Sequence, residues 1–213
     1  MELFSEQETH FTNDKKLILF LLIIIPVILA TIYLVGATIY LNSISHTQGP
    51  VHWHADYEIY ACGNKITMKE PTGLSNKVGS EVFHQHGDNR IHVEGVVVDV
   101  ADVDLHEFFE ATLGELEHDK LVVPTNEYVA EYKNGDKCNG DEGVLQVFLY
   151  KTIDGKAVQE KLIDFEDYVL SPYANIPPGD CLIIEFDKEK ETTNKLCETY
   201  RIAINKGALE HGS

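Results

Sequence analysis

Two H-x-H pairs lie within one short part of this sequence, and histidines at that spacing can bind metal ions. The stretch "VHWHADYEIYA" carries His52 and His54, and "FHQHGDNRIHVEG" carries His84 and His86. Residues i and i+2 of a β-strand face the same side, about 6.5–7 Å apart. Two imidazole rings at that spacing can converge on one ion, with metal–nitrogen bonds of about 2.0–2.1 Å. A second pair on a neighbouring strand would complete a shell of three or four nitrogens.

A fifth histidine, His92, follows the second pair across the turn "GDNR". The spacing leaves open which face of its strand it occupies. On the first strand, Trp53, Tyr57 and Ile59 alternate with the histidines and form the natural core face, so the histidine face is polar. Such a face is either a hydrogen-bonded surface or a site, and we favour a site. Four histidines are predicted to share one ion, with the fifth as a further candidate: His52, His54, His84 and His86, with His92.

The residue types favour copper(II) or zinc. All-imidazole ligation suits zinc, copper(II), nickel or iron, whereas copper(I) sites usually recruit methionine or cysteine. Met68 is the single methionine beyond the N-terminal region. Catalysis would need an open coordination position and a base. Four carboxylates lie nearby in sequence without an assignable role: Asp56, Glu58, Asp88 and Glu94.

The N-terminal region predicts a membrane anchor. Leu17 to Leu41 contains 25 residues without a charged side chain. At about 1.5 Å per helical residue, this run exceeds a hydrocarbon core of about 30 Å. Lys15 and Lys16 adjoin its start, and the positive-inside rule keeps such residues in the cytoplasm. A cleaved signal peptide is the alternative, since "VGA" resembles a cleavage site, but the run is longer than a signal core of roughly 7–15 residues.

We therefore predict a single-pass protein of the cell membrane with its C-terminal domain outside the cytoplasm. Its predicted parts are a cytoplasmic tail (1–16), a transmembrane helix (17–41), a tether (42–50) and an extracytoplasmic domain (51–213). The formal net charge is −18, and all but four of the 35 acidic residues lie in the last part. This charge excludes a nucleic-acid footprint and argues against docking on anionic lipid.

Calcium is a minor alternative ligand for the acidic domain. The stretch "NGDKCNGDEG" concentrates Asp, Asn and Gly. It lacks the D-x-[DN]-x-[DN]-G-x5-E spacing of a calcium loop. We favour a solvated, self-repelling acidic exterior as the explanation of this composition.

Four cysteines follow the apolar run: Cys62, Cys138, Cys181 and Cys197. An even number in an exported segment predicts two disulfides. The sequence has no C-x-x-C, so it indicates neither a redox motif nor a zinc knuckle. Three connectivities remain open.

Strand patterns dominate the exported part. The predicted strands and hairpins cover 53–61 with 65–68, 81–86 with 90–100, 143–158, 181–186 and 199–204. One helix is predicted to begin after Asp104, with Glu107 completing a capping box. Its apolar stripe runs from Leu105 through Leu113 and Leu116, with Gly114 near its end. The fold class is therefore α+β, a strand-rich domain with an antiparallel or mixed sheet and one main helix, preceded by the transmembrane helix. The segment "DYVLSPYANIPPGDCLIIEF" resembles the end of a β-grasp domain.

Two family resemblances arise from the histidine stretches. His52-x-His54-x3-Glu58 is similar to the opening of the cupin metal motif. However, the next glycine comes too early, and the late strand "CLIIEF" contains no histidine, so this resemblance is partial. It implies a metal-dependent oxygenase as a minority interpretation.

More of the chain resembles a group of uncharacterised, membrane-anchored extracytoplasmic proteins, common in archaea and in small-genome prokaryotic lineages. The pattern is "HWHADYEIYACGNK", "FHQHGDNRIHVEG", "DLHEFFEATLG" and "PPGDCLIIEF", over roughly residues 51–187. The resemblance implies an anchored exported domain and no known activity. Glu94 stands where some of these proteins carry another histidine, which places the role of His92 in question.

Three functions follow from these patterns. The leading hypothesis is a membrane-anchored extracytoplasmic protein that binds copper(II) or zinc through clustered histidines. The second is a metal-dependent enzyme, cupin-like or a hydrolase, that uses the same ligands with a carboxylate. The third is a structural or interaction domain without metal.

Overall fold

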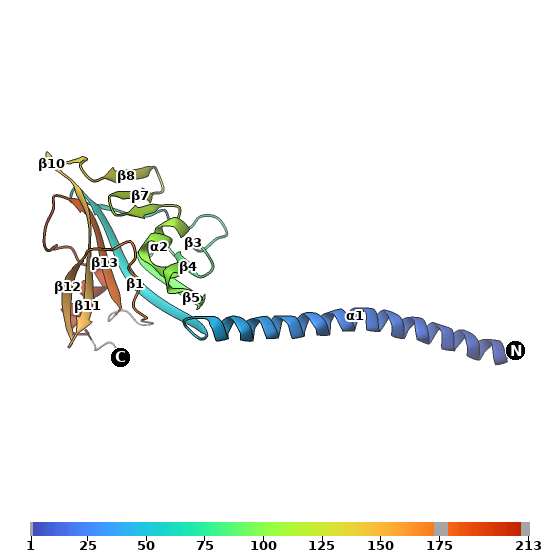
Figure 1. Ribbon diagram of the computed structural model, residues 1–213. Helices are drawn as coiled ribbons and strands as arrows, with labels where there is room; N and C mark the ends of the chain where they lie inside the picture. The colour runs from blue at the N-terminus through green and yellow to red at the C-terminus, as the bar shows by residue number, and fades with distance from the viewer. Residues whose placement is uncertain (1, 173–178, 210–213) are drawn as a thin grey trace. The chain divides into compact units, whose positions relative to one another are not determined.

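The chain forms two compact units, Met1–Ile44 and Ser45–Ser213. Figure 1 shows the computed structural model, which describes residues 2–172 and 179–209, with side chains from Asp14 onward. The first unit is a helix, α1 (Glu2–Ile44), and the second is a strand-rich domain with two further α-helices among its described residues.

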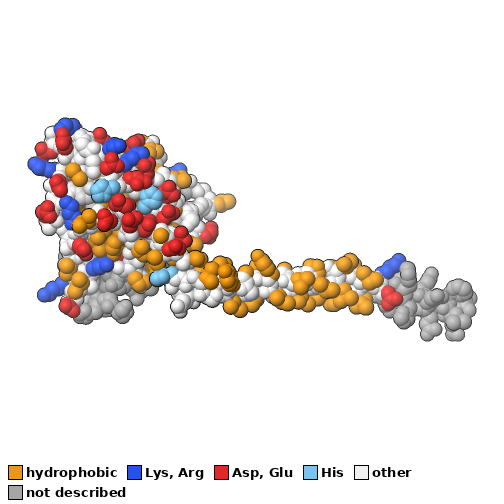
Figure 2. All heavy atoms as spheres, viewed as in Figure 1, with side chains coloured by type: hydrophobic (Ala, Val, Ile, Leu, Met, Phe, Trp, Pro, Cys, Tyr) orange, Lys and Arg blue, Asp and Glu red, His pale blue; other side chains and the backbone are white. Residues whose placement is uncertain are grey.

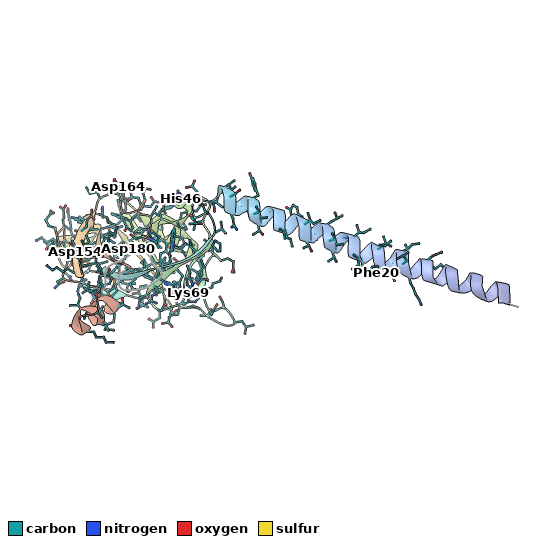
Figure 3. All side chains as sticks on the ribbon, turned by 90° about the horizontal axis from the view of Figure 1, so that it is seen from below. Phe20, His46, Lys69, Asp154, Asp164 and Asp180 are labelled. Carbon is teal, nitrogen blue, oxygen red and sulfur yellow. A yellow bond between two sulfur atoms is a disulfide. The ribbon has the colours of Figure 1, made fainter. Side chains whose placement is uncertain are left out.

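Helix α1 is apolar along most of its length. Its stretch Asp14–Ile44 reaches a mean hydropathy of 3.1 and is long enough to cross a bilayer. The apolar side chains, Phe20 among them, project outward around the helix (Figure 3) and are exposed. The hydroxyls of Thr31 and Thr38 donate to backbone carbonyls four residues earlier, so these polar groups are satisfied within the helix. The predicted apolar N-terminal helix is confirmed.

The segment predicted as a tether, 42–50, begins inside α1 and ends inside the first strand. Between these elements, the amide of His46 donates to the carbonyl of Val98 at 3.1 Å. The segment between α1 and β1 is therefore hydrogen-bonded to the segment that follows β5.

The strand-rich domain is built on one mixed sheet of eight strands. Its order is β12-β11-β13-β1-β5-β4-β3, and β2 pairs with β1. β1 is parallel to β13 and antiparallel to β5 and β2. The strands are β1 (Pro50–Ala61), β2 (Asn64–Ile66), β3 (Val78–Gly79), β4 (Phe83–Gln85), β5 (Arg90–Val96), β11 (Val144–Ile153), β12 (Lys156–Leu162) and β13 (Asp180–Asp187).

Two smaller sheets and three short helices complete the domain. One sheet has the order β6-β7-β8, and the other pairs β9 with β10. The elements are η1 (Val100–Val103), α2 (Leu105–Ala111), β6 (Glu115–Glu117), β7 (Lys120–Pro124), β8 (Val129–Lys133), β9 (Lys137–Cys138), β10 (Asp141–Glu142) and α3 (Glu198–Lys206). The predicted α+β fold class is confirmed.

The two faces of the large sheet are covered by different elements. On one face, Tyr57 and Phe83 pack against Phe108 of α2, with ring centroids 5.4 Å apart in both pairs. The buried side chains of β6 and β7 join the same core cluster. On the other face, Tyr60 of β1 packs in a second cluster with Tyr200 of α3. Burial of each such large side chain contributes about 1.5–3 kcal/mol.

Helix α2 begins as predicted and ends earlier. The Asp104 carboxylate accepts a hydrogen bond from the Glu107 amide at 2.9 Å, which confirms the N-cap. The helix ends at Ala111, Leu113 is exposed in the left-handed region, and Leu116 belongs to β6. A Cβ on Gly114 would lie 2.6 Å from the Val122 carbonyl oxygen, so glycine lets the chain turn closely against β7. The apolar stripe that was predicted for one helix is therefore divided between α2 and β6.

The predicted final strand over 199–204 is wrong, because this segment lies in α3. Tyr200 and Ala203, three residues apart, are its buried side chains, a spacing that suits a helix rather than a strand. Gly207 ends the helix with a φ of 63°. The sheet β6-β7-β8 had not been predicted. The turn "PPGD" of the β-grasp comparison lies partly outside the described residues.

Both predicted disulfides are present, and the connectivity is Cys62–Cys138 and Cys181–Cys197. The first joins the end of β1 to β9. The second joins β13 to the residue before α3, so it holds this helix against the second face of the large sheet.

Removing either disulfide should destabilise the strand-rich domain. A disulfide restricts the unfolded chain, more so when it closes a longer loop. The sequence separations are 76 and 16 residues. We expect losses of about 4 kcal/mol for the double variant Cys62→Ala/Cys138→Ala and about 3 kcal/mol for Cys181→Ala/Cys197→Ala. Chemical denaturation of the full chain in detergent, followed by fluorescence of Trp53, measures this, and losses below about 1 kcal/mol would contradict the expectation.

Candidate metal centre

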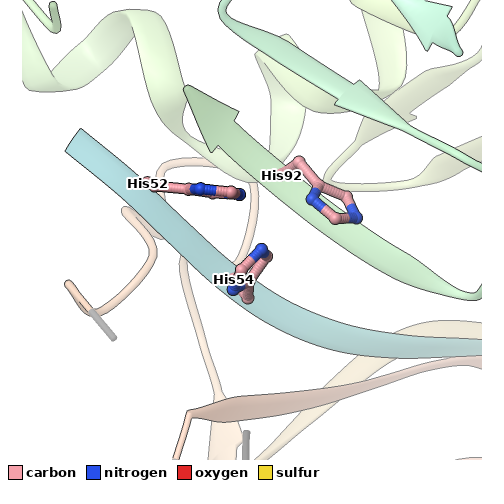
Figure 4. A group of neighbouring side chains, drawn as sticks. All are labelled: His52, His54 and His92. Carbon is pink, nitrogen blue, oxygen red and sulfur yellow. The ribbon is translucent and has the colours of Figure 1, made fainter. Parts of the chain in front are cut away.

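Four of the five predicted ligand residues lie on three neighbouring strands, β1, β5 and β4, and His86 directly follows β4. In the register of β1 and β5, His54 pairs with His92, and His52 pairs with Glu94. In the register of β5 and β4, His92 pairs with His84. Paired residues point to the same face of a sheet, so three histidines form one row across three strands. Figure 4 shows His52 and His54 on β1 and His92 on β5 with their rings gathered over the same face.

The five histidine rings form a continuous series of contacts. The His54 ring lies between those of His52 and His92, with centroids 4.5 and 4.7 Å away. The His92 ring also lies 4.6 Å from His86 and 5.6 Å from His84. The structure therefore brings all five predicted residues together. His92, whose face the sequence left open, occupies the centre.

The cluster runs from an open end to a buried end. The His52 side chain is 61% exposed, whereas His84 is 1% exposed. Further along β1, the N-terminus of α3 lies over Asp56 and Glu58, and both carboxylates are buried. The histidines precede this covered part, and His54 and His86 are also partly exposed, so solvent and ions can reach the cluster at more than one ring.

Two ring nitrogens in the cluster lack a hydrogen-bond partner among the described residues. They are the Nδ1 atoms of His84 and His92, both shielded from solvent. An unsatisfied buried polar atom costs about 1–3 kcal/mol. Such atoms are rare in native proteins, and a bound ion or water is a common explanation. A metal ion would satisfy an imidazole nitrogen directly.

Neighbouring groups orient two of the rings. The Nδ1 of His86 donates to the carbonyl of Asn76, which leaves Nε2 as the electron-pair donor. The Nε2 of His92 lies 3.3 Å from the carboxylate of Asp88, which leaves Nδ1 for an ion. Carbonyl and carboxylate partners of this kind hold metal-binding histidines in one orientation. Asn76 and Asp88 were not predicted in this role, because their contacts depend on loop conformation.

Burial and neighbouring charges keep His84 and Asp88 in protonation states that suit metal binding. Burial lowers the pKa of His84, although the charge of Glu94 opposes this, so at neutral pH the ring is in the neutral form that binds metal. Burial opposes ionisation of Asp88, but its contacts with His92 and Arg90 prevail and hold the pKa of this carboxyl below its usual range. Asp88 is therefore an anion that accepts from His92.

Glu94 contacts both ends of the cluster. Its Oε1 lies 3.0 Å from the Nε2 of His52, and its Oε2 lies 3.9 Å from the Nε2 of His84. The sequence alone assigns this carboxylate no role. Its i+2 spacing from His92 on β5 is the signal that places both on one face.

The cluster contains two sets of three side chains that could hold a metal ion. Within each set, the atoms lie within 4.8 Å of one another. Nitrogen ligands of one ion lie at most about 4.2 Å apart, so small side-chain rotations would close either set around an ion. The sets are His52, His54 and His92, and His84, His86 and Glu94.

A third set lies on α2, away from the cluster: His106, Glu107 and Glu110. The Nδ1 of His106 already donates to the carbonyl of Leu116 at 3.0 Å. This hydrogen bond also raises the pKa of His106. Because one ring nitrogen is engaged and the carboxylates are exposed, His106 serves better as a control than as a ligand.

Gly79 of β3 shields the buried end of the cluster. A Cβ at this position would lie 2.5 Å from the carbonyl oxygen of Phe83 and 2.7 Å from the Cα of His84. Its φ of 127° is also rarely adopted by residues with a side chain. Glycine therefore allows β3 to pair closely with β4 and exclude water from His84.

A small cavity adjoins the cluster through Asp88. It has a volume of about 40 Å³ and is lined by Asp56, Glu58 and the first residues of α3. Burial raises the pKa of Asp56 to about 6, although Arg90 donates to this carboxylate at 3.2 Å. Small-molecule pockets measure about 300–1,000 Å³, so this cavity has room for a few waters rather than for a substrate.

Comparison of the chain with known protein families, curated proteins and solved structures finds no match. The geometry described above is therefore the basis for assigning a function.

Replacing His84 by leucine should stabilise the metal-free protein. The substitution removes a buried nitrogen without a partner and keeps a side chain of similar size, so we expect a gain of about 1–2 kcal/mol in the free energy of unfolding. Chemical denaturation of chelator-treated full-length protein, followed by Trp53 fluorescence, measures the change.

The matched control is His106→Leu. This substitution removes a ring nitrogen that does have a hydrogen-bond partner, so we expect a loss of about 1 kcal/mol. A His84→Leu variant that is less stable than the metal-free parent would contradict the expectation that the Nδ1 of His84 destabilises the metal-free protein.

Proposed function

We propose that this protein is a membrane-anchored extracytoplasmic protein that binds copper(II) or zinc through its five clustered histidines. The observation that carries the proposal is the pair of buried Nδ1 atoms of His84 and His92, which have no hydrogen-bond partner in the part of the chain that the structure describes. They lie in a series of imidazole rings 4.5–5.6 Å apart. Its role would be metal capture, metal delivery or metal-dependent adhesion at the cell surface.

The ligand chemistry supports copper(II) or zinc. Imidazole nitrogens together with one carboxylate suit these borderline ions. The four cysteines are paired in disulfides, and Met68 is buried in the core, so neither offers the soft sulfur ligands that copper(I) prefers.

The overall charge of the protein supports binding of a cation. The formal net charge is −18, and acidic side chains predominate on the face of the strand-rich domain that Figure 2 shows. A field of this sign raises the local concentration of cations. The small volume of the adjoining cavity favours ion binding over conversion of a substrate.

Three features support the location. Helix α1 is long and apolar enough to span a membrane. Both disulfides lie in the second unit, and disulfides persist in oxidising compartments outside the cytoplasm. Lys15 and Lys16 adjoin the start of the apolar run, which favours a cytoplasmic N-terminus.

Metal binding can be measured on the full-length protein in detergent. Trp53 is the only tryptophan and lies between two site histidines, so bound copper(II) should quench its fluorescence. We expect His54→Ala and His92→Ala each to weaken binding by about tenfold or more. Their combined effect should not equal the product of the two, because the residues act on the same ion.

The control variants are His106→Ala and His118→Ala, which should bind copper(II) like the parent. Affinity should also fall as the pH drops through about 6.5, because protons then compete for imidazole nitrogens. Equal, small losses in all four variants would indicate scattered surface binding and would contradict the proposal, as would a parent protein that binds neither copper(II) nor zinc.

The proposed topology can be tested with protease on intact cells. Because the second unit is proposed to lie outside, we expect its digestion and the survival of a short membrane fragment that contains α1. Digestion after lysis provides the control for protease access. Complete protection of the second unit in intact cells would place it inside and overturn the assignment.

A further inference from the structure

One ligand set lies over β1 and β5, and the other lies over β5 and β4. β1 supplies His52 and His54 to one set, and the other set takes His84 and His86 from β4 and the residue after it. β5 lies between these strands. It supplies His92 to the first set and Glu94 to the second.

This arrangement is too wide for one ion. Neighbouring strands lie about 4.8 Å apart, so β1 and β4 are separated by about 9.6 Å. Side chains stand roughly perpendicular to a sheet, so they largely keep this separation. Two nitrogen ligands of the same ion lie at most about 4.2 Å apart. A single ion therefore cannot engage the histidine pairs of both outer strands.

Each set also has its own unsatisfied atom. His92, whose buried Nδ1 has no partner among the described residues, is a member of the first set, and His84, whose buried Nδ1 also has none, is a member of the second. The two rings are parallel within 3°, with centroids 5.6 Å apart. One ion in either set would leave the other nitrogen without a partner.

Glu94 is placed to connect the two sets. One of its carboxylate oxygens lies 3.0 Å from the Nε2 of His52, and the other lies 3.9 Å from the Nε2 of His84. A carboxylate can donate one oxygen to each of two ions, as in sites where two metals lie about 3.5–4 Å apart. Neither a histidine nor a glutamine at this position could offer two anionic oxygens, one to each ion.

We propose that the cluster is a binuclear centre for two divalent ions of the copper(II) or zinc class, bridged by the carboxylate of Glu94. The proposal rests on the function proposed above and deepens it. The first ion takes the three nitrogens of His52, His54 and His92 with one oxygen of Glu94. The second takes His84, His86 and the other oxygen, and water completes its shell. The second ion thus has one protein ligand fewer than the first.

Copper(II) titration with electron paramagnetic resonance tests this proposal on the full-length protein in detergent after removal of metal with a chelator. The parent should bind two equivalents. The first should give the full signal of an isolated copper(II) ion. The second should lower the signal per copper, because two bridged copper(II) ions couple magnetically.

Glu94→Gln is the diagnostic variant. Glutamine keeps the size of the side chain but cannot bridge two ions with charged oxygens. We expect the coupled signal to disappear and the affinity for the second equivalent to fall at least tenfold. Retention of the first equivalent shows that the variant is folded.

Glu81→Gln is the matched control, since Glu81 is a nearby glutamate that pairs with Lys77 at 2.7 Å, outside both sets. It should bind two equivalents with the coupled signal. His86→Ala should bind one equivalent, because it removes a ligand from the second set alone.

The possible results separate this proposal from the function on which it rests. Two coupled equivalents in the parent, with coupling lost in Glu94→Gln, support the binuclear centre. One equivalent in the parent overturns the binuclear centre and leaves the metal-binding function in place. Two equivalents of copper(II) without magnetic coupling would overturn the proposed bridge through Glu94. Absence of copper(II) and zinc binding overturns both proposals.

Discussion

The antiparallel register between β1 and β5 is the constraint on which the rest of the site depends. On the core face, this register pairs Ala55 with Ile91 and Trp53 with Val93, and three of these four residues are completely buried. A slip of one residue would move every side chain of β1 to the opposite face and bury the histidines in the core. Packing on one face therefore fixes the arrangement of His54 and His92 on the other. The candidate metal centre needs no separate device to align its strands.

The polar face of β1 is divided between two roles by the elements that cover it. The Cys181–Cys197 disulfide holds α3 over the second half of the strand. There the buried Glu58 is neutralised by Lys65 at 2.9 Å and accepts from the amide of Glu198. Tyr60 donates to its other oxygen, so both carboxylate oxygens of Glu58 have partners within the protein. In its first half, β1 instead presents His52 and His54 beside His92, whose Nδ1 has no hydrogen-bond partner among the described residues. The polar face of the strand therefore changes from a packed surface to the candidate metal centre within four residues.

The sequence allowed prediction of features that depend on local patterns. Alternation along β1 assigned its two faces correctly, and the long uncharged run identified α1. The face of His92 and the role of Glu94 depend on the order β1-β5-β4, which is set by pairings between distant segments. The helix α3 was mistaken for a strand because its short apolar pattern fits both periods. Its identity depends on packing against Phe148 and Ile183 and on a disulfide partner 16 residues away.

The covalent framework explains how the cluster keeps its geometry without an ion. Cys62 directly follows β1, and Cys181 is the register partner of Asp56 on the neighbouring strand. Both disulfides therefore restrain the strand that carries His52 and His54, one at its end and one at its middle. In small zinc domains the ion itself supplies the folding free energy, and the ligands are disordered without it. Here the core and the disulfides hold the clustered histidines in place without an ion. Under the proposed function, metal binding would therefore cost little conformational entropy.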